Sequence, residues 1–173
     1  MKILVVSDTH GQMKQIDEVI KKTKPFDYLI HAGDTEGQEN RIAREAGCET
    51  CFVRGNNDYY SDLPRDAVIE LFGHRIYVTH GHNLGVSMGT ERLRERAREE
   101  ECDIAVYGHT HRPVIDQSEE GLTVLNPGSL AYPRQEGREP SYITIDIDRF
   151  GEAHYTLNYL RRGPSAKKPR FFF

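Results

Sequence analysis

The chain has 173 residues, of which 37% are hydrophobic and 29% are charged, and its formal net charge is −4. This length supports one domain with a sizeable core but not two ordinary domains. The negative charge excludes a global basic field that would draw the chain to nucleic acid. No apolar run approaches a bilayer span, and three cysteines do not make a disulfide framework, so we expect a reduced, cytoplasmic protein.

Strands and helices alternate in the first third of the chain. Short apolar runs predict buried strands over residues 2–6, 27–32 and 49–53. Apolar residues at helical spacing predict helices over residues 12–22 and 36–46 between them. A strand–helix–strand–helix–strand order indicates a parallel sheet with right-handed crossovers.

The pattern changes after the first third. Strands are predicted over residues 67–72 and 75–79, followed by a charged helix over 90–101 and a strand over 104–107. From Pro113 onward the sequence indicates a β-meander, with strands over residues 114–116, 122–125, 142–147 and 154–160. We therefore expect a single domain over residues 1–160. The remaining residues, 161–173, are expected to form a basic tail that ends in three phenylalanines.

Polar side chains directly follow five of the predicted strands, in most cases beside a glycine. Open α/β sheets place their ligand sites at the carboxyl ends of strands, so we expect these side chains to meet. All offer oxygen or nitrogen donors, and burying so many polar groups together without a cation would be costly. The seven side chains are Asp8 and His10, Asp34, Asn56, His80, and His109 with His111.

This set of donors suits manganese, iron, zinc, cobalt or nickel. Seven protein ligands exceed what one tetrahedral ion needs, but they fit two ions that share one bridging carboxylate. Two divalent ions carry more positive charge than Asp8 and Asp34 can neutralise. The positive surplus that remains would attract phosphate.

Five segments resemble, in order, the motif blocks of the calcineurin-like metallophosphoesterase superfamily. They are Asp8-Thr9-His10, Gly33-Asp34, Gly55-Asn56-Asn57-Asp58, His80-Gly81 and Gly108-His109-Thr110-His111. The resemblance spans residues 1 to about 130. The short length and the Asn126-Pro127-Gly128-Ser129 stretch make the chain similar to the small YfcE-type phosphodiesterases of this superfamily. The resemblance implies an α/β fold, a four-layer α/β/β/α sandwich of two mixed sheets.

The resemblance also implies a two-metal phosphodiesterase with a metal-bridging hydroxide as nucleophile. We expect manganese, with nickel, iron, zinc or cobalt as alternatives. Carried over to this sequence, the first metal would be bound by Asp8, His10 and His111. The second would be bound by Asn56, His80 and His109, and Asp34 would bridge.

One position departs from the family pattern. Many members carry a histidine at the position of Asn57 as general acid, and an asparagine amide cannot donate a proton in that role. We therefore expect a preference for substrates with good leaving groups, such as aryl phosphodiesters, or the use of another acid. His82 is the candidate for that acid, and Asn56 and His82 are the candidate catalytic residues. Arg54 and Arg134 are candidate phosphate-binding residues, because they lie close in sequence to Asn56 and to the Asn126-Pro127-Gly128-Ser129 stretch, respectively.

Two other functions remain open from the sequence. The first is a non-catalytic metal-binding scaffold on the same fold, as the resemblance to a retromer subunit of this superfamily would allow. The second is a cyclic-nucleotide phosphodiesterase. The expected partner is a small phosphodiester, without nucleic acid or membrane, and homo-oligomer formation is compatible with the sequence. We interpret Cys48 and Cys51 as ordinary semi-buried cysteines, because they lie at the end of a predicted helix rather than at its start.

Overall fold

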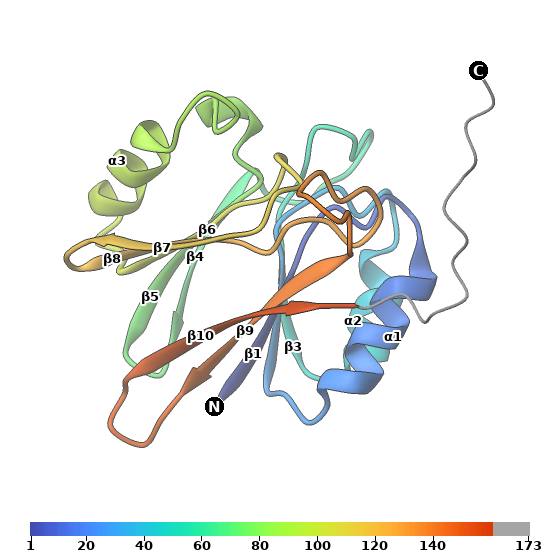
Figure 1. Cartoon of the computed structure of the whole chain (residues 1–173), viewed down its shortest axis with the longest axis horizontal. Helices are drawn as coiled ribbons and strands as arrows, with labels where there is room; N and C mark the ends of the chain where they lie inside the picture. Colours follow the sequence, from blue (N-terminus) through green and yellow to red (C-terminus); the bar gives the residue numbers. More distant parts are fainter. Residues whose placement is uncertain (161–173) are drawn as a thin grey trace.

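The computed structural model describes residues 1–160, and the predicted basic tail with Phe171, Phe172 and Phe173 lies outside the described residues. Two five-stranded mixed sheets pack face to face, and helices cover their outer faces (Figure 1). The predicted four-layer α/β/β/α sandwich is confirmed. Among the described residues, no helix is both long enough and apolar enough to cross a membrane.

The first sheet contains β10 (Ala153–Tyr159), β9 (Ser141–Ile147), β1 (Lys2–Val6), β2 (Tyr28–His31) and β3 (Glu49–Phe52), in this order. β1, β2 and β3 are parallel to one another, as their alternation with helices predicts. β9 runs antiparallel to β1 and closes the other side of the sheet together with β10.

The second sheet contains β4 (Asp66–Leu71), β5 (His74–Thr79), β6 (Ile104–Val106), β8 (Leu122–Asn126) and β7 (Val114–Glu119), in this order. β5, β6 and β8 are parallel, and each edge strand is antiparallel to its neighbour. The predicted four-stranded meander is therefore wrong. The β7–β8 hairpin joins the second sheet, whereas the β9–β10 hairpin returns to the first, where the almost continuously buried β9 fits between two neighbours.

Alternation along the strands divides the apolar side chains of the first sheet between two cores. In β1, Ile3 and Val5 point into the core between the sheets, where they meet residues of the second sheet such as Val78. The two residues of opposite parity, Leu4 and Val6, face α1 (Met13–Thr23) and α2 (Glu39–Ala46). Each fully buried aliphatic side chain stabilises the fold by about 1.5–3 kcal/mol, so the central strands are held firmly.

The helices differ in how well their limits follow from the sequence. α1 carries buried apolar residues at the predicted helical spacing. α3 (Glu91–Glu99) covers the second sheet through a short apolar stripe. α2 begins later than the predicted residue 36. Glu36 and Gly37 have φ angles of 53° and 79°, which a right-handed helix cannot contain. The loop between β2 and α2 is therefore longer than expected and stays beside the strand ends.

Candidate metal centre

The seven predicted side chains converge at one end of the sandwich, between the two sheets. The loops that follow β1, β2 and β3 bring side chains from the first sheet, and the loops after β5 and β6 bring side chains from the second. Each of the seven lies within hydrogen-bonding or ion-pair distance of another member. In chain order they are Asp8, His10, Asp34, Asn56, His80, His109 and His111.

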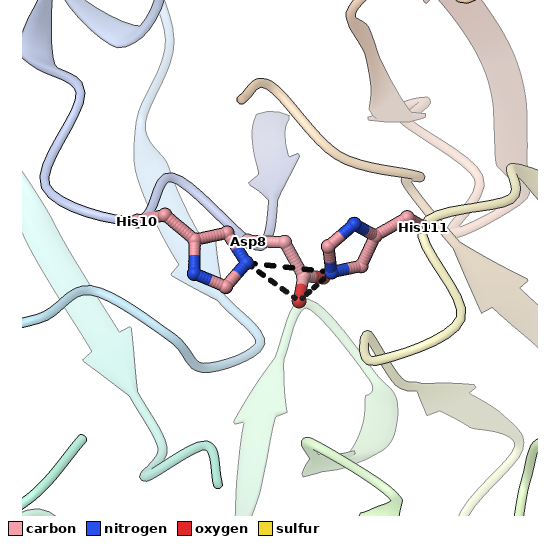
Figure 2. A group of neighbouring side chains, drawn as sticks. All are labelled: Asp8, His10 and His111. Carbon is pink, nitrogen blue, oxygen red and sulfur yellow. Dashed lines mark hydrogen bonds and ion pairs between the residues drawn. The ribbon is translucent and has the colours of Figure 1, made fainter. Parts of the chain in front are cut away.

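Asp8, His10 and His111 form the first group (Figure 2). Oδ1 of Asp8 lies 3.1 Å from Nε2 of His111 and 3.9 Å from Nε2 of His10. The two histidine Nε2 atoms are 3.3 Å apart. Asp8 Oδ1 is buried and accepts no hydrogen bond from the described residues. A buried carboxylate oxygen without a donor is costly, so the three converging atoms fit a cation.

Asn56, His80 and His109 form the second group. Oδ1 of Asn56 lies 3.0 Å from Nε2 of His80 and 3.0 Å from Nδ1 of His109. Asp34 lies between the two groups, because its Oδ2 is 3.6 Å from Nε2 of His80 and 3.7 Å from Nε2 of His10. The arrangement has two sets of three donors and one carboxylate shared between them.

The backbone at this cluster adopts a conformation that most residues avoid. The left-handed region costs an L-residue about 1–2 kcal/mol. Five of the seven side chains belong to residues with positive φ, and the surrounding contacts hold them there. The amide of Asp8, for example, donates to the carbonyl of Gly33 at 3.0 Å. The five residues are Asp8 (φ 54°), His10 (44°), Asp34 (58°), His109 (66°) and His111 (57°).

Two glycines allow the loops to approach the carboxylates closely. A Cβ atom on Gly55 would lie 2.0 Å from Oδ1 of Asp34. A Cβ atom on Gly108 would lie 2.1 Å from Oγ of Ser7 and 2.9 Å from Oδ2 of Asp8. No side chain larger than hydrogen fits at either position without moving the cluster.

A family model for the calcineurin-like phosphoesterase superfamily domain matches residues 1–149. The chain belongs to this superfamily. The predicted family is confirmed, and with it the predicted class of enzyme, a metal-dependent phosphoesterase.

Two curated relatives in the superfamily match most of the chain. The probable metallophosphoesterase YsnB of Bacillus subtilis is 31% identical over 151 residues, which cover 86% of this chain and 85% of that protein. The phosphodiesterase YfcE of Escherichia coli is 30% identical over an alignment of 173 positions that covers 86% of this chain and 89% of that protein.

Solved structures share the fold over nearly the whole chain. A predicted phosphoesterase from Streptococcus pneumoniae has a TM-score of 0.75 at 30% identity, over 92% of this chain and 97% of that chain. Vps29 from Entamoeba histolytica in complex with zinc has a TM-score of 0.71 at 22% identity, over 92% of this chain and 99% of that chain. At this lower identity the likeness concerns the fold alone.

Three histidines of this phosphoesterase are oriented through Nδ1, which leaves Nε2 to face the cluster. Nδ1 of His80 donates to the carbonyl of Ala32 at 2.7 Å, and Nδ1 of His111 donates to the carbonyl of Tyr132 at 2.8 Å. The third, His10, has a carboxylate partner. Its Nδ1 lies 2.8 Å from Oε1 of Glu36, a residue for which the sequence predicts a helix and no role in the site.

Replacing Glu36 by alanine should weaken manganese binding about 10–100-fold, because a carboxylate behind a ligating histidine fixes its ring and raises its basicity. Calorimetric titration of metal-free protein with Mn²⁺ measures this. Glu45→Ala is the matched control, since Glu45 is exposed on α2, away from His10. Equal manganese affinities of the Glu36 variant and the wild type would show that Glu36 does not support the site.

Asn57 and Asp58 hold Asp34 and its loop. The backbone amide of Asn57 donates to Oδ1 of Asp34 at 2.8 Å, and its side-chain amide donates to Oδ2 at 2.7 Å. The buried carboxylate of Asp58 accepts from the amides of Asp34, Glu36 and Gly55 at 2.6–2.8 Å. The sequence of this motif block predicts a missing general acid at Asn57. The structure shows that it orients the shared carboxylate.

A small cavity of about 200 Å³ opens over the cluster. Arg134 and Tyr132 lie in its wall beside the candidate ligands. The structure thus brings Arg134 to the site, whereas Nη1 of Arg54 lies 3.4 Å from the carbonyl of Ser61 in the following loop. His82 stands behind the second group, with its ring centroid 5.3 Å from that of His80. Burial and the charges of neighbouring histidines lower the pKa of His82, which favours its neutral form.

The electrostatics of the first group follow from its contacts. Burial alone would raise the pKa of Asp8, but the close contact with His111, the positive charge of the nearby histidines and the hydrogen bond from Ser7 lower it below its ordinary value. Burial acts against protonation of His111, yet its contacts with Asp8 raise its pKa, while the nearby charge of Arg134 opposes this. The carboxylate of Asp8 is therefore ionised and available to a cation.

His31 is fully buried and lies behind the cluster. Its ring stacks on Phe52 at a centroid distance of 5.7 Å, and its Nε2 lies 3.1 Å from Oγ1 of Thr9. Burial lowers the pKa of His31 to about 4, so the ring is neutral in the folded protein at neutral pH. These contacts indicate a packed histidine rather than a ligand. The three cysteines are free thiols, and burial raises the pKa of Cys51 to about 11.

His31 should make the stability of the metal-free protein depend on pH. An unfolded histidine takes up a proton below about pH 6.5, whereas the buried ring does so only below about pH 4. The contribution of neutral His31 to the free energy of unfolding is complete above pH 6.5. It is lost as the pH falls towards 4, because the unfolded state then binds more protons. We expect a loss of about 3 kcal/mol that His31→Phe does not show. Urea unfolding of both proteins across this range measures the difference, and parallel curves would contradict it.

Proposed function

We propose that this phosphoesterase is a two-metal phosphodiesterase. One observation carries the proposal: six donors divide into two groups of three, and the Oδ2 atom of Asp34 lies between them. The first ion would be held by Asp8, His10 and His111, and the second by Asn56, His80 and His109. The names of the relatives YfcE and YsnB agree with this activity.

The donor set of carboxylate, amide and imidazole suits manganese, with nickel, iron, zinc or cobalt as alternatives. A pair of divalent ions would neutralise the charge of the phosphate and supply an activated water as nucleophile. The chain itself contributes orientation and charge. Asn57 fixes both oxygens of Asp34, and Arg134 presents a guanidinium to phosphate oxygens in the cavity.

Phosphodiesters with good leaving groups are the proposed substrates. The backbone and side-chain amides of Asn57 each donate to Asp34, and an amide N–H is not acidic enough to protonate a departing alkoxide. Burial and the charges of neighbouring histidines lower the pKa of His82, so its neutral form, which has no proton to give as a general acid, is favoured. Without general acid help, worth typically about 10²–10⁴-fold, the rate should depend steeply on the pKa of the leaving group.

The test is hydrolysis of bis-p-nitrophenyl phosphate by protein that is first stripped of metal and then loaded with Mn²⁺ or Ni²⁺. Activity that appears with the metal supports the proposal. Full metal occupancy without hydrolysis would instead favour a non-catalytic metal-binding scaffold.

A series of aryl phosphodiesters with leaving groups of graded pKa tests whether a general acid takes part. We expect the rate to depend steeply on the pKa of the leaving group. A flat dependence would show that an acid is present, and loss of that flatness in His82→Ala would identify it. The cytoplasmic location and the oligomeric state stay predictions from the sequence.

A further inference from the structure

A second cavity, of about 340 Å³, lies beside the cavity over the metal cluster. The two share Arg134 in their walls. The volume corresponds to roughly ten water molecules in the liquid, which is enough for a substantial organic group. Its main lining residues are Val86, Tyr107, Thr110, Arg112, Val114 and Arg134.

One side of this second cavity is apolar. Val86 and Tyr107 are 5% and 4% exposed, so they are firmly held parts of the second sheet's outer core. Val114 opens β7 and is partly exposed. A carbon chain or other apolar segment of a ligand would find suitable contacts here.

Two arginines give the cavity its charge. Within residues 1–160, neither Arg112 nor Arg134 forms an ion pair with a carboxylate. The contrast is Arg94 on α3, which is held by Asp116 at 2.6 Å and Glu119 at 3.1 Å. The guanidinium groups of Arg112 and Arg134 are therefore available to an anion from outside the chain.

The cavity is tied to the candidate metal ligands by the chain itself. Thr110 lies between His109 and His111, and Arg112 directly follows His111. The amide of Arg134 donates to the carbonyl of His111 at 3.0 Å. A phosphodiester whose phosphorus lies over the cluster can therefore extend one arm along Arg134 into the second cavity.

We propose that the second cavity binds the arm of the substrate that is not cleaved, and that it selects an arm ending in a second anionic group. The apolar wall would contact the carbon part of the arm, and Arg112 would bind its terminal carboxylate or phosphate. Arg134, which lies in the walls of both cavities, would contact the phosphate over the cluster. This inference rests on the proposed phosphodiesterase function and names the class of substrate: a phosphodiester with a second negative charge on its retained arm.

The first test compares two substrates with the same leaving group, so that the chemical step stays constant. One is p-nitrophenyl butyl phosphate, and the other carries a carboxylate in place of its terminal methyl group. For the manganese-loaded wild type at low salt, we expect kcat/KM to be at least about tenfold higher for the carboxylate, mainly through KM. In Arg112→Gln this ratio should fall to near one. Arg44→Gln, which removes an exposed charge on α2, should keep the ratio of the wild type.

The second test measures binding without turnover, by calorimetry on manganese-loaded protein. Butylphosphonate is compared with its analogue that ends in a carboxylate, and the same preference and the same effect of Arg112→Gln are expected. If both esters are hydrolysed equally well and both phosphonates bind equally, the second cavity does not select an anion, although the phosphodiesterase function stands. If neither ester is hydrolysed but the carboxylate phosphonate binds more tightly, the anion site stands and the proposed activity is wrong.

Discussion

Asp34→Asn should lower kcat/KM on bis-p-nitrophenyl phosphate by at least about a thousandfold. Asp34 is the carboxylate whose Oδ2 lies within 3.7 Å of histidines from both groups, and Asp8 is the other carboxylate among the seven candidate ligands. Metal ions in such sites stabilise the transition state by several kcal/mol, and about 4 kcal/mol corresponds to a thousandfold change in rate.

The substitution also disturbs orientation, although an amide has the size of a carboxylate. Asn57 donates hydrogen bonds to both oxygens of Asp34. An asparagine would present its NH₂ group to one of these donors, and two donors cannot bond each other. Metal content after dialysis and kcat/KM measure the result. Asp62→Asn, an exposed aspartate in the neighbouring loop, serves as control. Activity within tenfold of the wild type would exclude a bridging role for Asp34.

Removal of metal should lower the melting temperature by about 5–10 °C. Free manganese at a hundred times its Kd stabilises the folded state by about 2.7 kcal/mol. For a domain of 150–250 residues, each kcal/mol shifts Tm by about 2–4 °C. In the metal-free protein, the buried oxygen of Asp8 has no donor among the described residues, so this part of the fold gains most from a cation.

Thermal unfolding in EDTA and then with excess Mn²⁺ checks this expectation. The shift should reverse when EDTA is added again. Asp8→Asn is the informative variant, because it keeps the shape of the side chain and removes the charge. It should show a clearly smaller shift with Mn²⁺, because the second group of donors is unchanged. An equal shift in the variant would mean that manganese stabilises the protein elsewhere.

The sequence was sufficient to predict the strands whose ends carry the candidate ligands. A short apolar run followed at once by polar residues and glycine leaves a local signal, and each of the seven side chains follows such a run. Because the carboxyl ends of parallel strands open at one edge, local patterns predicted a long-range cluster. The structure brings all seven side chains together, as expected.

Features that depend on contacts between distant segments could not be predicted from the sequence. The sequence predicts a helix that begins at Glu36, whereas in the structure Glu36 has positive φ and contacts His10. The hydrogen bonds from Asn57 to Asp34 join loops 23 residues apart. No local pattern distinguishes the sheet to which β9 belongs, since a doubly buried strand fits the centre of either.

The candidate ligands divide between the two sheets in a way that bears on unfolding. The first sheet supplies Asp8, His10, Asp34 and Asn56, and the second supplies His80, His109 and His111. His10 and His111 are separated by 101 residues in sequence, so a cation held by both would act as a reversible cross-link between the two halves of the sandwich. In the metal-free protein the sheets could part first at this end. In the loaded protein they would open only together with the core, and the amides of β1 and β6 would then exchange their hydrogens at the same slow rate.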